Sequence, residues 1–196
     1  MKIIFLDHDG VICLSTEWGG RFKKQKEVGR KLSQSVASLP VMSRFDNFNK
    51  KAIKILNEIL EETNAEIVVS SDWKRWANVE EMGEYYESQG LKKKPIGFTK
   101  FLQDCEVPQN FPWSRTYDLE QSRSLEIKQY LQDHPEITHW VAVDDLNMGI
   151  PQTNETWGDM VMDWGLTNFV LTPYSIEGIK QSGIKEKIIK FLTNDI

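Results

Sequence analysis

The stretch Ile3-Ile4-Phe5-Leu6-Asp7-His8-Asp9-Gly10 decides how this chain of 196 residues folds. Four successive apolar residues, closed by an acidic turn with a glycine, are typical of a strand that ends in a loop. A strand without polar alternation is buried on both faces, as in parallel sheets covered by helices. The stretch therefore predicts a central strand of an α/β domain, with two carboxylates at its carboxyl end.

Strand-like and helix-like segments alternate along the rest of the chain. Short β-branched or apolar runs predict further strands over residues 65–70, 95–98, 139–143 and 169–171. Apolar residues at helical spacing predict helices from residue 48 to a cap at Asn64, over 77–90, over 122–131 with Ser122 as the N-cap, and over 176–192. This alternation predicts a mostly parallel sheet in a Rossmann-like three-layer sandwich, with 3–6 between 67–70 and 140–143.

The composition narrows the class of protein. Lys and Arg number 24 against 29 Asp and Glu, so the formal net charge of −5 argues against a uniformly basic nucleic-acid-binding surface but leaves room for a local basic patch. Cys13 and Cys105 are far apart and form no CxxC pair, which disfavours a zinc site or a disulfide framework. No apolar run approaches the ~20 residues of a membrane span. We expect a cytoplasmic protein without a membrane partner.

Polar side chains follow three of the predicted strands. They are Asp7 and Asp9 after the first strand, Ser70 and Ser71 after the second, and Asp144 and Asp145 after the strand over 139–143. The carboxyl ends of parallel strands meet at one edge of the sheet, where ligands bind. Clustered carboxylates repel one another unless a cation lies among them, and hard oxygen ligands suit Mg²⁺. A single Asp after a strand is usually a turn or cap residue, but the joint pattern predicts a metal-assisted site.

These residues carry a resemblance to a known family. Residues 3–11 resemble the first motif of the haloacid dehalogenase (HAD) superfamily, residues 67–70 its second motif, and residues 140–145 its fourth motif in the double-Asp form. Val69-Ser70-Ser71-Asp72-Trp73-Lys74 is similar to the V-S-S-x-W-R signature of the HAD domain of Swiss-army-knife RNA repair proteins. Gly97-Phe98-Thr99 and Arg123-x-x-Glu126-Ile127 with Tyr130-Leu131 also look like that subgroup. The likeness covers nearly the whole chain except residues 14–45.

The resemblance implies a phosphohydrolase and assigns roles to residues. Asp7 would attack phosphorus and form an aspartyl-phosphate. Asp9 would act first as general acid and then as general base. Ser70 and Ser71 would bind the phosphoryl group, and Mg²⁺ would be held by Asp7, Asp9, Asp144 and Asp145. Which of Asp144 and Asp145 contacts the metal directly stays open.

Arg123 marks a departure from the superfamily pattern. The superfamily normally supplies a Lys at this place, before the fourth motif. Arg keeps the charge and grips phosphate with two N–H groups, but it is not equivalent to Lys. Lys128, further along the same helix, is the alternative source of the cation. The non-functional interpretation of Lys128 is that it is an ordinary exposed lysine on the helix surface. The non-functional interpretation of Arg123 is that it forms an ordinary salt bridge with a nearby acidic residue.

Three other residues near the motifs have two interpretations each. Lys74 is equally compatible with a phosphate contact and with a solvent-exposed position. Trp73 is expected to pack over the sheet rather than to contact a phosphate or a base. His8 is expected to point outward from the loop, without a role.

The domain organisation and the substrate are less determined by the sequence. We expect a single HAD-like domain over 1–196, with residues 14–45 as a small cap insert or with no cap at all. The basic segment 21–31 is typical of a solvated helix face. A small cap would leave the site open to phosphorylated polynucleotide ends or phosphoproteins, but small metabolites and nucleotides are alternatives. A binding module that kept the fold without catalysis is the third hypothesis, and the oligomeric state is not predicted.

Overall fold

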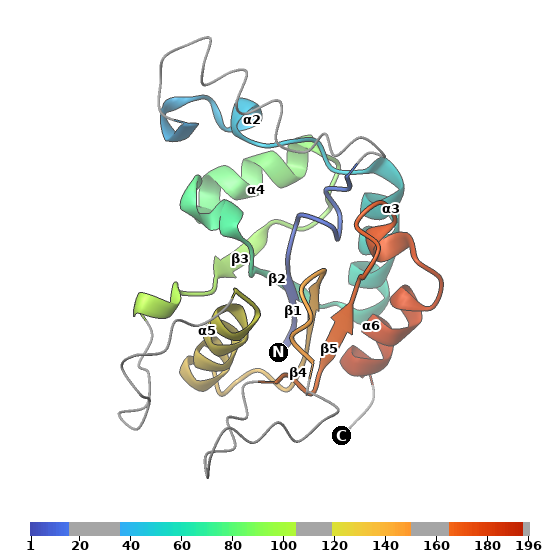
Figure 1. Ribbon diagram of the computed structural model, residues 1–196. Coiled ribbons are helices and arrows are strands. Elements are labelled where there is room, and N and C mark those ends of the chain that lie inside the picture. Colours follow the sequence, from blue (N-terminus) through green and yellow to red (C-terminus); the bar gives the residue numbers. More distant parts are fainter. Residues whose placement is uncertain (16–35, 105–118, 150–164, 194–196) are drawn as a thin grey trace.

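The computed structural model describes residues 1–15, 36–104, 119–149 and 165–193 (Figure 1). Five parallel strands form one sheet in the order β3-β2-β1-β4-β5. The strands are β1 (Lys2–Leu6), β2 (Glu66–Val69), β3 (Pro95–Phe98), β4 (His139–Asp144) and β5 (Phe169–Leu171). The structure thus confirms the α/β class, and it places the first strand between the second and the fourth as predicted.

The register of the sheet aligns the polar strand ends. Leu6 of β1 pairs with Val69 of β2 and with Val143 of β4. The next residues along the three strands are Asp7, Ser70 and Asp144, which therefore lie side by side at the carboxyl edge. The main chain extends this pairing, since the Ser70 N–H donates to the carbonyl of Leu6 (2.9 Å) and the Asp7 N–H to that of Val143 (3.1 Å).

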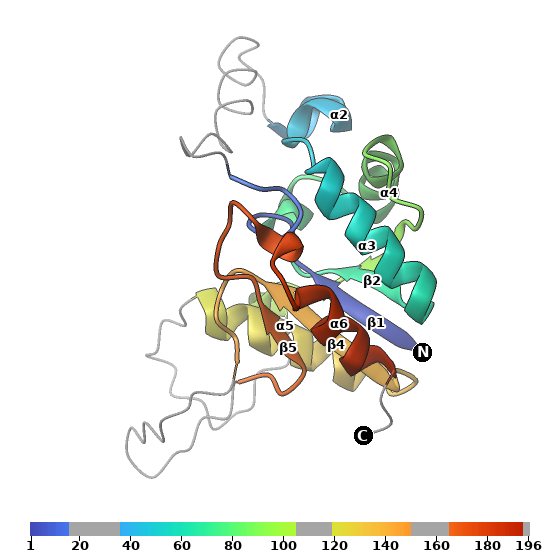
Figure 2. The ribbon, with the colours of Figure 1, turned by 90° about the vertical axis from the view of Figure 1, so that its right-hand side faces the viewer.

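Helices cover both faces of the sheet and bury two separate cores. Side chains alternate along a strand, so Ile4 and Leu6 of β1 face one core and Ile3 and Phe5 the other. The larger core contains residues of α3 (Lys50–Thr63), α4 (Val79–Ser88) and α6 (Ile184–Thr193), whereas α5 (Leu119–Asp133) packs on the opposite face. Figures 1 and 2 show α3 and α6 on one side of the sheet and α5 on the other.

Caps at the helix ends explain where α3 and α4 begin and end. The Asn49 side chain accepts hydrogen bonds from the N–H groups of Lys51 and Ala52 at the start of α3. Asn64 ends α3 in the left-handed conformation with φ of 53°, which confirms the predicted cap. Asn78 and Glu81 form a capping box at the start of α4. Arg44 of α2 (Val41–Arg44) also binds both carboxylate oxygens of Glu81, each at 2.8 Å.

Two predicted helices start elsewhere. The helix expected over 176–192 is wrong in its first half, where the chain forms a 3₁₀ turn, η5 (Gly178–Lys180), before α6. Gly178 and Gly183 have φ of +54° and +82°, a backbone conformation that interrupts a right-handed helix. Ser122 is not the N-cap of its helix, because α5 includes Leu119 and Ser122 lies inside it.

Short 3₁₀ turns complete the described chain. They are η2 (Val36–Ser38), η3 (Asp72–Arg75) and η4 (Leu102–Asp104). Of the predicted insert 14–45, residues 16–35 lie outside the described residues, as does the basic segment 21–31. Among the helices that the structure describes, none combines the length and apolar character that crossing a membrane requires.

Candidate active site

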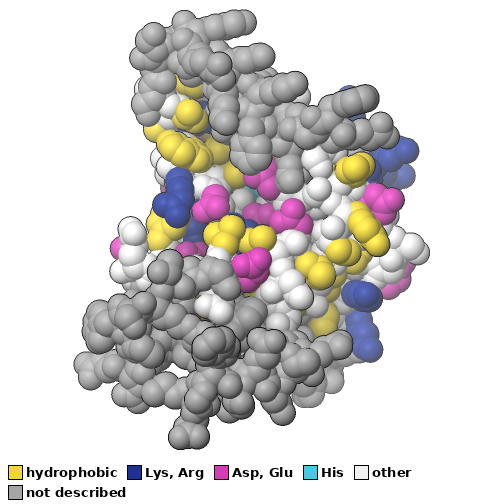
Figure 3. Space-filling view, viewed as in Figure 1, with side chains coloured by type: hydrophobic (Ala, Val, Ile, Leu, Met, Phe, Trp, Pro, Cys, Tyr) yellow, Lys and Arg dark blue, Asp and Glu magenta, His cyan; other side chains and the backbone are white. Residues whose placement is uncertain are grey.

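Three carboxylates meet at the carboxyl edge of the sheet. One oxygen atom from each of Asp7, Asp144 and Asp145 lies within 4.8 Å of the others. Asp7 and Asp144 are almost fully buried, with 3% and 1% of their surface exposed. Figure 3 shows acidic side chains gathered near the middle of the face that carries this edge. The sequence prediction that these carboxylates converge is therefore confirmed by their positions.

Gly10 makes room for Asp145 in this cluster. Its φ of +74° is a conformation that residues with a side chain rarely adopt. A Cβ atom at this position would also lie 2.0 Å from Oδ2 of Asp145, far inside van der Waals contact. Gly10 is therefore required twice, by the turn after β1 and by the close approach of the carboxylate.

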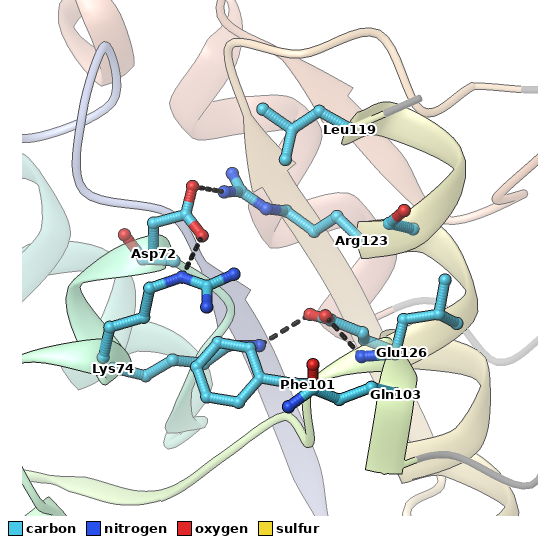
Figure 4. Close-up of a pocket in the computed structure, with 11 residues that line it drawn as sticks. Asp72, Lys74, Phe101, Gln103, Leu119, Arg123 and Glu126 are labelled. Atoms are coloured by element: carbon cyan, nitrogen blue, oxygen red, sulfur yellow. Dashed lines mark hydrogen bonds and ion pairs between the residues drawn. The ribbon is translucent and has the colours of Figure 1, made fainter. Parts of the chain in front are cut away.

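Arg123 supplies the cation of the site from helix α5. Its Nη1 atom lies 3.1 Å from Oδ1 of Asp7 and 2.8 Å from Oδ2 of Asp144. Its Nη2 atom lies 3.6 Å from Oδ2 of Asp72. Figure 4 shows the Arg123 and Asp72 side chains pointing toward each other. Lys128 is five residues further along, which turns its side chain about 140° around the helix axis from Arg123. Position therefore favours Arg123 over Lys128 as the cation beside Asp7.

Burial and repulsion disfavour the charged forms of the carboxylates. Burial raises the pKa of Asp7 well above its usual range, although Arg123 opposes the shift. Burial likewise raises the pKa of Asp144 to about 6, again against the effect of Arg123. Three ionised carboxylates and one guanidinium leave about two uncompensated negative charges. A divalent cation would balance that charge, and an all-oxygen donor set fits Mg²⁺.

Two serines line the site from the end of β2. The Ser71 hydroxyl hydrogen-bonds Asp7, which favours the charged form of that carboxylate and lowers its pKa against the larger effect of burial. The Ser70 hydroxyl is buried and has no hydrogen-bond partner in the part of the chain that the structure describes. A buried hydroxyl without a partner costs about 1–3 kcal/mol, so this atom is available for a ligand at the strand end.

Asp9 lies outside the cluster of Asp7, Asp144 and Asp145 and forms a hydrogen bond with Trp73. The indole Nε1 of Trp73 donates a hydrogen bond to Oδ2 of Asp9 at 3.0 Å. The group of carboxylates close enough to share an ion, among the described residues, contains Asp7, Asp144 and Asp145 but not Asp9. The sequence predicted that Trp73 packs in the core, and it does, with 6% of its surface exposed. The contact with Asp9, 64 positions away, carried no sequence signal.

His8 is buried rather than turned outward, so the sequence prediction for it is wrong. Its Nε2 atom forms a hydrogen bond with the Tyr86 hydroxyl at 2.7 Å. Its ring lies against Phe48 and Trp73, at centroid distances of 5.5 and 4.6 Å. Burial lowers the pKa of His8 to about 3, so the imidazole is neutral at physiological pH. His8 therefore belongs to the aromatic packing beneath the loop, next to the catalytic candidates.

Lys74 is engaged by other protein groups. Its Nζ atom donates to Oγ1 of Thr99 (2.9 Å), to the carbonyl of Lys100 (3.2 Å) and to Oε2 of Glu126 (2.6 Å). These bonds use all three ammonium hydrogens. Figure 4 shows Lys74 and Glu126 meeting behind the ring of Phe101. The arrangement ties η3 to β3 and α5, and it leaves Lys74 without a free donor for phosphate.

A cavity of about 180 Å³ opens beside Arg123. Ser71 and Arg123, which both contact Asp7, belong to its lining, together with residues of η3, η4 and α5. The Arg75 guanidinium carbon lies 4.4 Å from the centroid of Phe101 within this cavity. The lining thus combines charged side chains with an aromatic ring, and it reaches Asp7 through Ser71 and Arg123.

The segment after β5 supports the loop after β1, a contact that the sequence did not indicate. The Thr172 hydroxyl donates to the carbonyl of Gly10 at 3.2 Å. The Ile179 N–H donates to the carbonyl of Val11 at 2.9 Å. A Cβ atom at Gly178 would lie 2.2 Å from the same carbonyl oxygen, so only glycine permits this approach. Gly178 was the one feature of the sequence from which this close approach could have been suspected.

Comparison with protein families agrees with this geometry. Residues 3–168 match the family described as the HAD domain in Swiss Army Knife RNA repair proteins. The chain belongs to this family. Membership indicates a hydrolase of the phosphatase type in general. The matched range includes the carboxylates, serines and arginine of the site, which are Asp7, Asp9, Ser70, Ser71, Arg123, Asp144 and Asp145, and it ends before the supporting segment after β5. Comparison with curated proteins and with solved structures finds no match.

Proposed function

We propose that this HAD-family protein is a Mg²⁺-dependent phosphohydrolase that forms an aspartyl-phosphate on Asp7. One observation carries the proposal: Asp7 contacts Arg123 and lies close enough to Asp144 and Asp145 to share one ion with them, and a separate carboxylate, Asp9, follows two residues later. The arrangement supports the roles of nucleophile for Asp7, cation for Arg123, metal ligands for Asp144 and Asp145, and acid–base group for Asp9. The match to the HAD family supports the same reaction type.

Asp7, Asp144 and Asp145 would hold the Mg²⁺ ion. Their oxygen atoms are close enough to share one ion, and their uncompensated charge matches a divalent cation. When bound, Mg²⁺ supplies charge neutralisation that lets an anionic phosphate approach an anionic carboxylate. We leave open which of Asp144 and Asp145 binds directly.

The proposed reaction has two steps, and Asp9 gives up a proton in the first step and takes one up in the second. In the first, an oxygen of Asp7 forms a bond to phosphorus while the bond from phosphorus to the leaving oxygen breaks, and protonated Asp9 gives its proton to that oxygen. In the second, the Asp9 carboxylate takes a proton from water as the water oxygen bonds to phosphorus. The bond between phosphorus and Asp7 breaks, which regenerates Asp7 and releases phosphate.

Arg123, Ser70 and Ser71 would bind the phosphoryl oxygens. The guanidinium remains charged at any working pH, because the lowering effect of burial on its pKa is outweighed by the ion pairs with Asp7 and Asp144, which raise it. The unpartnered Ser70 hydroxyl is a donor at the same strand end. Such fixed donors stabilise the negative charge of the transferring group without reorganisation. Lys74 has no part in this set, because its hydrogens are already used.

The proposed substrate is a phosphorylated polynucleotide end. The family description, which refers to RNA repair proteins, supports this class. A nucleotide or a small metabolite is the second candidate, supported by the small size of the cavity beside Arg123. A non-catalytic binding module is disfavoured, because the nucleophile, acid–base, cation and metal positions are all occupied by suitable residues.

A substrate panel tests the proposal. Purified protein with Mg²⁺ is offered oligonucleotides phosphorylated at the 3′ or 5′ end, nucleoside monophosphates and small phosphomonoesters, and phosphate release is measured. We expect release that stops with EDTA and in the Asp7→Asn variant. Equal release by wild-type protein and by Asp7→Asn with Mg²⁺ would refute the covalent mechanism. Release from nucleotides but not from oligonucleotide ends would move the substrate to the second candidate.

A further inference from the structure

Trp73 joins the aromatic core to the acid–base candidate. Its indole N–H donates to one carboxylate oxygen of Asp9, Oδ2, at 3.0 Å. Asp9 lies in the loop after β1, and Trp73 lies in the turn η3 after β2, so the bond crosses between two strand ends. Asp9 is half-buried, and Trp73 is almost fully buried. The buried indole N–H of Trp73 therefore donates to the half-buried carboxylate of Asp9 at the edge of the site.

The indole is fixed by packing on several sides. Phe45 stacks on it in parallel, with a centroid distance of 4.5 Å and an interplanar angle of 6°. Phe48 stacks at 5.6 Å, Tyr85 contacts it edge-on at 6.1 Å, and the His8 ring lies at 4.6 Å. The Trp73 main chain is also anchored, because its N–H donates to the Ser71 hydroxyl. The direction of the indole N–H is therefore set by its surroundings rather than by Asp9.

We propose that Trp73 is a positioning residue for proton transfer by Asp9. The inference rests on the proposed phosphohydrolase function. With Oδ2 held by the indole, the carboxyl proton in the first step resides on Oδ1, which is then directed at the leaving oxygen. The same oxygen takes the proton from water in the second step, so the indole bond to Oδ2 favours the same active oxygen in both steps. Trp73 has only a donor and no acceptor, so it cannot compete for that proton.

Trp73→Phe is the variant that separates positioning from packing. Phenylalanine keeps an aromatic ring between Phe45 and His8 but removes the N–H donor. Without the donor, Oδ2 of Asp9 loses the hydrogen bond that orients it, and proton transfer loses part of the roughly 10²–10⁴-fold that general acid catalysis typically contributes. The readout is kcat/KM for two aryl phosphates, because this ratio reports the first irreversible step, the attack by Asp7. Phenyl phosphate needs a proton at its leaving oxygen, whereas 4-nitrophenyl phosphate leaves as a stable anion.

We expect a selective loss in Trp73→Phe. Its kcat/KM falls about tenfold for phenyl phosphate, part of the range for general acid catalysis, and less than about twofold for 4-nitrophenyl phosphate. In an Asp9→Asn background the added Trp73→Phe change has no further effect on the ratio of the two substrates, because the acid is already absent. Trp140→Phe is the matched control, since Trp140 packs on Phe5 in the opposite core and should leave the ratio unchanged.

Each result decides the inference. Equal losses for both substrates, or no loss, in a Trp73→Phe protein that melts like the wild type would overturn the positioning role while the proposed function stands. A further selective loss on top of Asp9→Asn would show that Trp73 acts by another route, which also overturns it. A wild-type protein that hydrolyses neither aryl phosphate nor any member of the substrate panel with Mg²⁺ would remove the proposed function, and the inference with it.

Discussion

The two sides of Asp7 are built from different chemistry. Towards β4 lies a charged side, formed by Arg123, Asp144 and Asp145, in which groups are held by ion pairs at 2.8–3.1 Å and by mutual proximity. Towards β2 lies a neutral side, formed by Ser70, Ser71 and Trp73, which offers hydroxyl groups and one indole N–H. The register that sets three strand ends level brings Asp144 and Ser70 to the two flanks of Asp7, whereas Arg123 comes from α5 and Trp73 from η3.

The difference between the sides separates two tasks. Charges on the charged side act over several ångströms, so they suit binding an ion and lowering the repulsion around Asp7. Neutral donors act only in hydrogen-bond contact, so they suit fixing the direction of one atom. Changes on the charged side should therefore alter metal dependence, whereas changes on the neutral side should alter rate at an unchanged metal requirement.

Among these variants, Arg123→Ala should cause the largest loss of activity, because it removes the positive group of the charged side. It leaves Asp7 and Asp144 buried without their counter-ion, and we expect kcat/KM to fall about 10²–10³-fold, the scale of one lost charge-stabilising donor. Arg123→Lys should recover part of the loss, and Lys128→Ala should stay near the wild type. Steady-state kinetics on the preferred substrate measures all three variants. A crippled Lys128→Ala beside an active Arg123→Ala would assign the cation to Lys128.

Asp145→Asn should weaken Mg²⁺ binding, and added Mg²⁺ should rescue the activity of the variant. Removing one carboxylate from the cluster should raise the Mg²⁺ concentration for half-maximal activity by at least roughly tenfold. Excess Mg²⁺ should then restore much of the rate, because the nucleophile is intact. Ser70→Ala, on the neutral side, is the control and should keep the wild-type Mg²⁺ dependence. An Asp145→Asn variant with unchanged Mg²⁺ affinity would place the metal ligands elsewhere.

Ser70→Ala should lower the rate without lowering stability. The hydroxyl has no partner among the described residues, so its removal breaks no hydrogen bond of the folded protein. We expect kcat to fall roughly tenfold, below the range for a donor to a full oxyanion, and the melting temperature to stay the same or rise. Kinetics and thermal denaturation of one preparation check both statements. A clear loss of stability would mean that Ser70 has a structural partner instead.

Protonation of Asp144 should change the stability of the metal-free protein by a smaller amount. Burial raises its pKa to about 6 in the folded state, above the ordinary value of 3.8, so the folded state binds the proton more tightly than the unfolded state. In EDTA, stability should therefore fall as pH rises between about 4 and 6, the window of these two values. Mg²⁺ should restore stability above that window, and Asp144→Asn should reduce the slope, leaving the part that the raised pKa of Asp7 contributes. Thermal denaturation across this range measures both effects.

Local sequence patterns predicted the charged side better than the neutral side. Each carboxylate of the charged side directly follows an apolar strand, so strand order and register were enough to bring Asp7, Asp144 and Asp145 together. Arg123 was found from its place in the family pattern. The contact between Trp73 and Asp9, and the buried position of His8, depend on how an aromatic cluster packs. Packing joins residues far apart in sequence and leaves no local pattern.

The errors in secondary structure have a similar origin. The apolar spacing over 176–192 suits a helix, but Gly178 must approach the carbonyl of Val11, and this tertiary contact replaces the first half of the helix with a turn.

The environment of Lys74 also depends on a residue far away in the sequence. The sequence allowed a phosphate contact for Lys74, but a buried ammonium group needs hydrogen-bond partners, and Glu126 from α5 is one of them. In both cases a residue distant in sequence decided the outcome.

A trapped phosphoryl group on Asp7 tests the central claim most directly. The Asp9→Asn variant with 4-nitrophenyl phosphate is suited to this, because the first step needs no acid with this substrate while the second step lacks its base. The account predicts that acid quench and peptide mass spectrometry find a phosphoryl group on Asp7, that it is sensitive to hydroxylamine, and that it is absent from Asp7→Asn. Release of 4-nitrophenol by this variant with Mg²⁺, without a phosphoryl group on Asp7 at any quench time, would contradict the account.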